Sequence, residues 1–199
     1  MVNQLKFDSK RLALLASLVA LNSVVRLLGV GVAGMETAFA LLIIGASVFG
    51  PTFGASLGAL SLLTSAAIGA GVGPWLPFQM ISAALVGLAA GFLPKPKIMR
   101  IRLFWLCSYG VISSYVYGLF MTAWTWPLFV GAGSSVAFLA GGSIWENTWR
   151  LLVFDFVSGG FIWNTGRAIT TVTLLLLTGK TLVTTLERAT TRVFVKFEA

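Results

Sequence analysis

Long apolar stretches, separated by short polar connectors, fill most of this chain. A helix that crosses a bilayer needs about 20 predominantly apolar residues. The pattern therefore predicts an all-α integral membrane protein with six transmembrane helices at approximately residues 12–28, 37–49, 52–70, 78–93, 103–123 and 160–177. The second segment is the shortest, and we expect a tight turn at Gly50 and Pro51 to join it to the third.

Lysines and arginines gather in three places: before the first apolar segment, between the fourth and fifth, and after the sixth. These residues are Lys6, Lys10 and Arg11; Lys95, Lys97, Arg100 and Arg102; and Lys180, Arg188, Arg192 and Lys196. Six crossings place all three clusters on one side of the membrane, and short basic connectors stay cytoplasmic. We therefore expect loop 94–102 and both termini in the cytoplasm, with residues 179–199 as a polar-faced helix there.

Composition supports the membrane assignment. Hydrophobic residues make up 57% of the chain and charged residues only 10%, with a mean hydropathy of +0.93. Soluble domains carry about 25% charged residues. The net charge of +8 is explained by a cytoplasmic face against anionic headgroups, so it does not call for a nucleic-acid partner.

The sequence lacks the residues that most enzymes use. It has no histidine, one cysteine, no Walker A pattern and no GxSxG motif. It also lacks a Cys/His cluster that could bind a metal and a run of intramembrane acids suited to a proton relay. We therefore expect no catalytic residues, no metal and no intrinsic cofactor, and any ATP hydrolysis would belong to partner subunits.

Four charged residues fall at or near membrane depth outside the basic clusters. A charge at the bilayer centre costs about 2.5–3.5 kcal/mol on insertion scales, so such residues face partners or a water-filled cavity. We expect Arg26 to pair with Glu36, and Asp155 with Arg167. These pairs would either hold the outer loops to the bundle or form a polar floor that captures a ligand. Residues 149–157 are apolar but too short to cross, which predicts an interfacial or partly re-entrant outer helix.

Small residues share one face of the first predicted helix. Ala13, Ala16 and Ala20 are spaced i, i+3, i+7, and small-xxx-small pairs let membrane helices approach closely. The face could dock another membrane subunit or pack within the same bundle. Packing within the bundle is also an option for the pairs Gly54/Gly58 and Gly87/Gly91.

Most of the tryptophans fall on the predicted outer side: Trp75, Trp124, Trp126, Trp145 and Trp149. An interfacial belt uses tryptophan, but a belt usually lines both faces of the membrane. The alternative is an aromatic-lined outer cavity for a large, partly planar ligand. The pattern leaves both interpretations open.

Two stretches give the most specific support for a family resemblance that covers nearly the whole chain. They are Gly73-Pro74-Trp75-Leu76-Pro77-Phe78-Gln79-Met80, leading into Gly87-Leu88-Ala89-Ala90-Gly91, and Trp163-Asn164-Thr165-Gly166-Arg167-Ala168. With six predicted spans and the small-residue face, they resemble the substrate-binding S components of energy-coupling factor (ECF) vitamin transporters, in particular the cobalamin-type subgroup. That subgroup has Trp-Asp-x-x-Arg-Ala in the second stretch. Asn164 stands here in place of the Asp, which puts its pairing with Arg167 in doubt and leaves Asp155 as a substitute.

The resemblance implies a function. Such an S component lies in the bacterial plasma membrane, binds a vitamin in an outward-facing cavity and delivers it to the cytoplasm. The resemblance implies cobalamin or a related corrinoid as the first choice of vitamin. A transmembrane coupling subunit, which would contact Ala13, Ala16 and Ala20, and two cytoplasmic ATPases supply the energy. Loop 29–36, with Gly29, Gly31 and Gly34, would act as a gate. The residues expected to bind substrate are Gly31, Gly34, Glu36, Trp75, Gln79, Trp124, Trp126, Trp163 and Arg167.

Two other hypotheses remain. A membrane scaffold or assembly protein without a ligand would leave the outer loops with no defined cavity. An integral membrane enzyme is disfavoured by the missing histidines and acid pairs. Within the importer hypothesis, recognition of a different vitamin would require changes only in the loops of this protein. A closed pocket of about 300–1,000 Å³ lined by the outer tryptophans favours a ligand-binding protein, whereas filled outer loops favour the scaffold.

Overall fold

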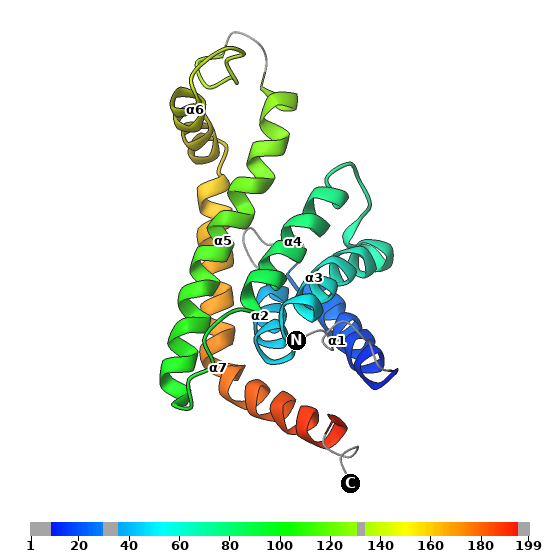
Figure 1. The fold of residues 1–199 in the computed structure, drawn as a ribbon. Helices are drawn as coiled ribbons and strands as arrows, with labels where there is room; N and C mark the ends of the chain where they lie inside the picture. Colours follow the sequence, from blue (N-terminus) through cyan, green and yellow to red (C-terminus); the bar gives the residue numbers. More distant parts are fainter. Residues whose placement is uncertain (1–8, 30–35, 131–133, 195–199) are drawn as a thin grey trace.

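The computed structural model describes residues 9–29, 36–130 and 134–194. These residues form helices joined by short loops (Figure 1). Among them, three elements are long and apolar enough to cross a membrane: Pro51–Ala70, Met99–Pro127 and Gly160–Thr190. Two shorter apolar helices, Ala38–Phe49 and Leu76–Ala90, accompany them. The all-helical prediction is confirmed, and the three long helices are compatible with a membrane-embedded protein.

The N-terminal half packs around one fully enclosed helix. α1 (Ser9–Leu27) and α3 (Pro51–Ser65, continued by the π-helical turn η2, Ala66–Ala70) surround α2 (Ala38–Phe49). Nearly every residue of α2 is buried, which explains its continuous apolar sequence. Gly50 joins α2 to α3 with a φ of 94°, a conformation that glycine adopts at no steric cost. The turn predicted at Gly50 and Pro51 is therefore confirmed.

Glycines let α3 and α4 (Leu76–Ala90) cross in close contact. A Cβ atom on Gly54 would lie 2.2 Å from the carbonyl oxygen of Gly87, and one on Gly58 would lie 2.3 Å from that of Ala83. A Cβ atom on Gly91 would lie 2.3 Å from the Cα atom of Pro51. These glycines therefore pack within the bundle, as one of the two sequence interpretations expected.

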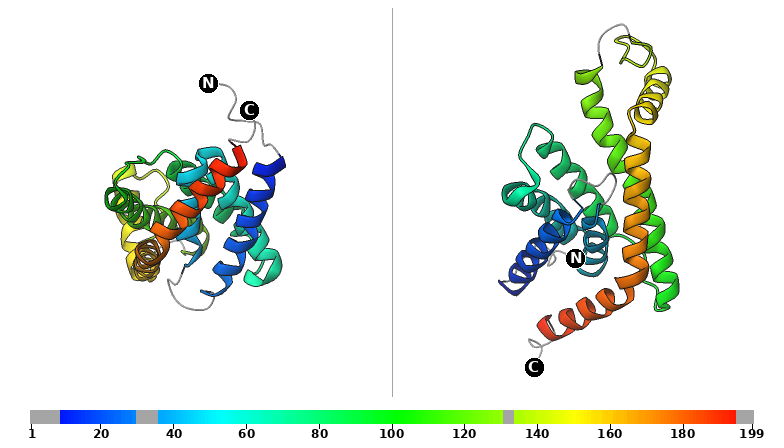
Figure 2. Two further views of the ribbon diagram at one scale, coloured as in Figure 1. Left: turned by 90° about the horizontal axis from the view of Figure 1, so that it is seen from below. Right: turned by 180° about the vertical axis from the view of Figure 1, so that it is seen from behind.

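The C-terminal half contains two long helices and a short one. α5 (Met99–Phe129) and α7 (Gly160–Phe194) run side by side in all views, and α6 (Ile144–Val157) lies at one end of the molecule (Figures 1 and 2). α6 is a separate short helix, as residues 149–157 suggested. Figure 1 shows that the C-terminal part of α7 bends toward the N-terminal half.

Two helices extend beyond the predicted spans. The fifth segment was expected to end at residue 123, but α5 continues to Phe129, so Trp124 and Trp126 are helical. The sixth was expected to end at 177, with a separate tail helix. α7 instead continues to Phe194, because Val183 and Leu186 on its inner face are buried in the same core as the rest of the bundle.

Contacts bring basic residues from distant segments to one end of the molecule. Arg11 of α1 donates to the Phe49 carbonyl oxygen at 2.9 Å. Lys95, between α4 and α5, donates to the Val48 carbonyl oxygen at 3.4 Å. Near the same end, Arg102 of α5 forms an ion pair with Glu187 of α7. The last carbonyls of α2, where a helix carries partial negative charge, thus lie among cations, which stabilises this end.

Candidate functional site

A buried polar face runs along the first half of α7. Asn164, Arg167 and Thr171 are spaced i, i+3, i+7, so they lie on one side of the helix. Asn164 is 2% exposed, Arg167 8% and Thr171 0%. Polar groups so deeply buried require partners, which makes their surroundings the first place to look for a binding site.

Arg167 is held by neutral groups. Its Nη1 donates to the Ser114 carbonyl oxygen at 3.1 Å and to Asn164 Oδ1 at 3.0 Å. The guanidinium carbon lies 4.7 Å from the ring centroid of Tyr117 and 5.6 Å from that of Phe39. These two rings are in an edge-to-face arrangement at 5.1 Å. The cation is therefore framed by two aromatic faces, which attract it electrostatically.

No carboxylate pairs with Arg167 among the described residues. The expected partner Asp155 is buried, and its Oδ1 accepts a hydrogen bond from Thr122 Oγ1 at 2.6 Å. The predicted Asp155–Arg167 pair is therefore wrong, and Asp155 ties α6 to α5 instead. Asn164 accepts a hydrogen bond from Arg167 through its amide oxygen.

Several buried donors near Arg167 have no partner. They are Arg167 Nε, Asn164 Nδ2 and the Thr171 hydroxyl. A buried donor without an acceptor costs about 1–3 kcal/mol, and an unpaired buried cation costs more. The arrangement therefore suits an incoming group that accepts hydrogen bonds or carries negative charge.

The predicted ion pair between Arg26 and Glu36 is confirmed. Arg26 Nε lies 3.3 Å from Glu36 Oε1, and Arg26 Nη1 donates to Ser65 Oγ at 2.9 Å. The Thr37 hydroxyl donates to the Val25 carbonyl oxygen. These contacts tie the end of α1 to the start of α2 and the end of α3. Tyr117, which contacts Arg167, also lies near Glu36 and Arg26, so the two charged groups share one neighbourhood.

The outer tryptophans divide into two groups. Trp124 stacks on Phe78 of α4, with centroids 4.1 Å apart and planes 6° apart, and its buried Nε1 has no partner. Trp124 lies two helical turns beyond Tyr117 on the same side of α5. Trp75 and Gln79, at the start of α4, flank Phe78 in sequence. Among the described residues, no recorded interaction joins Trp75, Gln79 or Trp124 to the Arg167 cluster.

Trp126 and Trp163 take other positions. Trp126 is buried, donates to the Val136 carbonyl oxygen at 2.6 Å, and meets Phe138 edge to face, so it fills the outer loop. Trp163 is 49% exposed, whereas Asn164 and Arg167 face inward. Neither residue contacts the Arg167 cluster in a recorded interaction. Gly31 and Gly34 lie outside the described residues.

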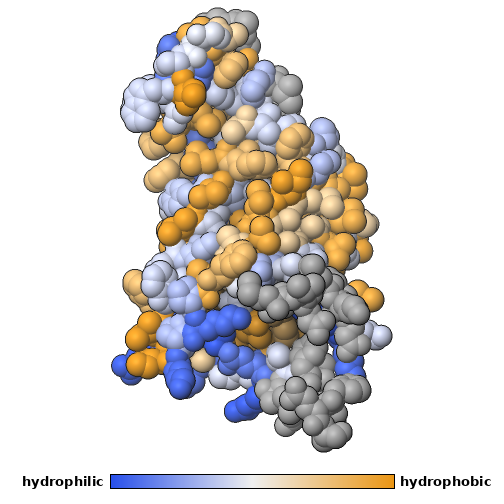
Figure 3. Space-filling view, in the orientation of Figure 1, coloured by the Kyte–Doolittle hydropathy of each residue, from blue (hydrophilic) through white to orange (hydrophobic). Residues whose placement is uncertain are grey.

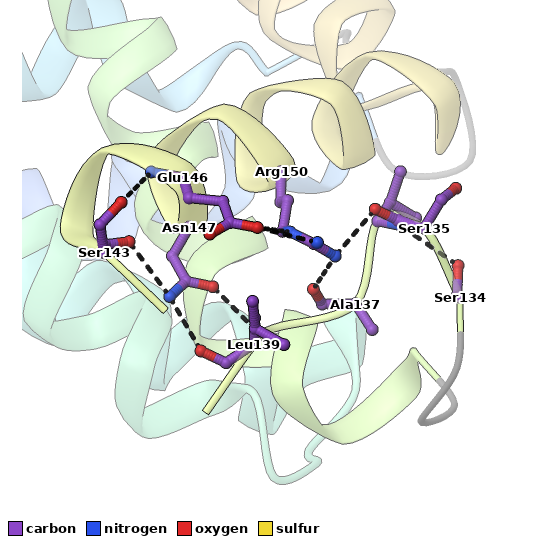
Figure 4. A network of polar contacts seen from close by, with 9 residues as sticks. Ser134, Ser135, Ala137, Leu139, Ser143, Glu146, Asn147 and Arg150 are labelled. Carbon is purple, nitrogen blue, oxygen red and sulfur yellow. Dashed lines mark hydrogen bonds and ion pairs between the residues drawn. The ribbon is translucent and has the colours of Figure 1, made fainter. Parts of the chain in front are cut away.

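Side chains of α6 organise the loop that precedes it (Figure 4). Asn147 accepts from the Leu139 amide at 2.9 Å and donates to the Leu139 carbonyl oxygen at 3.0 Å. Arg150 donates to the carbonyl oxygens of Ser135 and Ala137 and pairs with Glu146. The result is an ordered outer cap over the end of α5.

Sequence reasoning missed Tyr117, Phe39 and Asn147. The spacing of Asn164, Arg167 and Thr171 would have revealed the polar face of α7. Tyr117 and Phe39 carry no comparable signal, because neither forms a helical spacing pattern with other polar residues that would point to a site. The Ser143-x-x-Glu146 pattern marks the start of α6, where the Ser143 hydroxyl accepts from the Glu146 amide at 3.1 Å.

The three alanines expected to dock a partner are exposed on α1. Their side chains take little part in packing against the helices of this chain, while the opposite face of α1, with Leu15, Leu18 and Val19, is buried. The structure therefore does not show these alanines packing within the bundle.

A pocket of about 460 Å³ lies between α4 and α5. Its lining is almost entirely apolar and includes none of the tryptophans expected to form the ligand cavity. No family model matches the chain, and neither the curated proteins nor the solved structures include a match.

Proposed function

We propose that this chain crosses a bacterial plasma membrane six times, with both ends in the cytoplasm. The contacts of Arg11, Lys95 and Arg102 support this topology, because they gather cations from three segments at one end. That end is the cytoplasmic one under the positive-inside rule. α2 and α4 are short for a crossing, and enclosure of α2 among the other helices compensates for its length.

Within that membrane, the chain is the substrate-binding subunit of an ECF-type vitamin importer. The observation that carries this proposal is Arg167: a buried cation framed by aromatic rings, with no carboxylate partner and with unpartnered donors beside it. Charged residues at membrane depth mark functional sites. A site of this kind recognises a ligand with hydrogen-bond acceptors and a broad ring surface.

A corrinoid is the first choice of ligand. It presents a large ring for Tyr117, Phe39 and Trp124, and polar groups at its rim for Arg167 and Asn164. Trp75, Gln79 and Glu36 contribute from the mouth of the site. The Arg26–Glu36 ion pair holds the start of α2 beside the end of α1 at this mouth.

Delivery of the ligand depends on partners. The exposed alanine face of α1 docks a transmembrane coupling subunit, because small residues permit close helix approach. Two cytoplasmic ATPases bound to that subunit supply the energy. This chain itself performs no catalysis.

Calorimetric titration of the purified protein in detergent tests the proposal. The panel contains cobalamin, its precursor cobinamide and other vitamins. Sub-micromolar binding of a corrinoid supports the full proposal, and binding of another vitamin retains the mechanism but replaces the substrate. If monodisperse, folded protein binds nothing in the panel, the importer assignment is wrong.

A scaffold without a small ligand is the second candidate. The packing of Trp126 into the outer loop favours it, because a filled outer side leaves less room for a ligand. Affinity purification from native membranes separates the two functions. A scaffold retains its partners regardless of vitamin supply and binds none of the panel.

A further inference from the structure

The groove between α4 and α5 is a surface feature that the vitamin site does not use. Ser82, Val86 and Ser113 form its buried floor, and Leu85, Phe92 and Ile112 are among the exposed side chains around it. Tyr109 spans the groove and donates to the Val86 carbonyl oxygen at 2.6 Å. Its volume of about 460 Å³ lies within the range of pockets that bind small molecules.

The two ends of the groove differ. Beyond its outer end, Phe78 and Trp124 stack across α4 and α5. Its inner end leads from Phe92 toward the connector between the same two helices, where Lys95 and Lys97 follow within five residues. Figure 3 shows hydrophilic residues gathered at the lower end of the molecule, where Figure 1 places that connector, and an apolar band above them.

The dimensions of the groove match one membrane leaflet. Along α5 its lining extends from Tyr109 to Phe120, a rise of about 16 Å at 1.5 Å per residue. This is about half of a hydrocarbon core that is about 30 Å thick. Trp105, half-exposed on α5 between the groove and the basic end, marks the level at which tryptophan favours the interface.

Cations at the inner end are available to an anion. Lys97, five residues after Phe92, is exposed and has no recorded hydrogen bond or ion pair within the described residues. Arg100 lies about 180° around α5 from the groove-lining Tyr109, so it faces away from the groove. Lys95, Lys97 and Arg102 outnumber Glu187 at this end, so net positive charge remains near the groove for a negatively charged headgroup to offset.

We propose that an anionic phospholipid of the inner leaflet occupies this groove, with one acyl chain along the exposed apolar lining of Leu85, Phe92 and Ile112 and its phosphate at Lys97. The apolar lining of the groove favours binding of the acyl chain, and the nearby positive charge favours a negatively charged headgroup. The proposal rests on the membrane location proposed above but not on vitamin binding. The lipid holds α4 and α5 at a fixed separation along their inner halves.

Native mass spectrometry of the delipidated full-length protein tests this proposal. The protein is titrated with phosphatidylglycerol and with phosphatidylcholine that have identical acyl chains. We expect phosphatidylglycerol to bind at least tenfold more tightly. Ala89→Phe fills the groove from an exposed position and should weaken binding of both lipids at least fivefold. Ala67→Phe, at an exposed alanine of η2 outside the groove, is the matched control and should change neither affinity.

Charge variants test the headgroup contact separately, and they alter only exposed side chains. Lys97→Gln should reduce the preference for phosphatidylglycerol about fivefold. Lys180→Gln removes the same charge from α7 and should leave the preference within twofold. Equal binding of the two lipids by the wild type, or equal effects of variant and control, would overturn the proposal.

The vitamin panel, applied to the same samples, separates the two proposals. If the wild-type protein binds a vitamin but does not prefer phosphatidylglycerol, only the lipid proposal is refuted. If it prefers phosphatidylglycerol but binds no vitamin, only the importer assignment is refuted.

Discussion

Gly118 shows how a single residue sets the position of Asn164, and through it that of Arg167. A Cβ atom at Gly118 would lie 1.6 Å from Asn164 Oδ1, which is far inside van der Waals contact. Asn164 Oδ1 accepts the hydrogen bond from Arg167. The absence of one methyl group on α5 therefore allows the buried amide on α7 to orient the guanidinium.

Gly118→Ala should destabilise the protein by about 1–3 kcal/mol through overpacking, measured as a lower thermal unfolding midpoint in detergent. Adding Asn164→Ala removes the clashing amide, so the double variant should be more stable than Gly118→Ala alone. A double variant that is less stable than either single variant would show that the clash is not the cause.

Residue pairing was the part of the site that the sequence predicted least well. The Arg26–Glu36 pair could be predicted because the two charges flank one short loop. The Asp155–Arg167 pair was wrong, because matching charges along a chain cannot show that Thr122 satisfies Asp155. Nor could charge alone place the rings of Phe39 and Tyr117 around Arg167, since three helices converge there.

At the scale of elements, the apolar pattern located α2 and α4 to within a few residues but underestimated α5 and α7. The predicted fifth span ends at residue 123, whereas α5 continues through Pro127, although proline disfavours a helix interior. The stack of Trp124 on Phe78 and the burial of Trp126 keep that segment helical. Such packing depends on partners far away in sequence, so the local pattern does not reveal it.

The exposed face of α1 predicts a specific loss of assembly. Ala16→Leu with Ala20→Leu should leave the stability of the isolated subunit within about 0.5 kcal/mol, because both positions are exposed. The same variant should fail to copurify with the coupling subunit. Ala67→Leu is the control at another exposed alanine. Normal assembly of the α1 variant would remove the docking proposal.

The hydrogen bonds of α6 predict how the outer cap is ordered. Asn147→Ala removes both contacts with the Leu139 backbone, so the Leu139 amide should exchange with deuterium at least tenfold faster. Thr148→Ala, which removes only a contact within α6, should leave that rate unchanged. Equal exchange in the two variants would mean that Asn147 does not hold the cap.

At the scale of the whole molecule, the clustering of cations at one end predicts a single orientation. In a Cys107→Ser background, Val72→Cys should react with a membrane-impermeant maleimide in intact cells, because residue 72 lies in an exposed outer turn. Lys97→Cys should react only after permeabilisation. The reverse labelling pattern would show that the topology is inverted. Labelling of both sites in intact cells would show that no membrane crossing separates residues 72 and 97.

The most direct test of the central claim is a parallel titration of wild type, Arg167→Met and Arg188→Met with the vitamin that the panel identifies. Arg167→Met should weaken binding about 10- to 100-fold, as expected for a lost charge-assisted hydrogen bond, without lowering the unfolding midpoint, because it removes a buried cation that has no carboxylate partner. Arg188→Met, at an exposed position of the same helix, should bind like the wild type. Equal affinities in all three proteins would contradict the assignment of Arg167 as the floor of a ligand site.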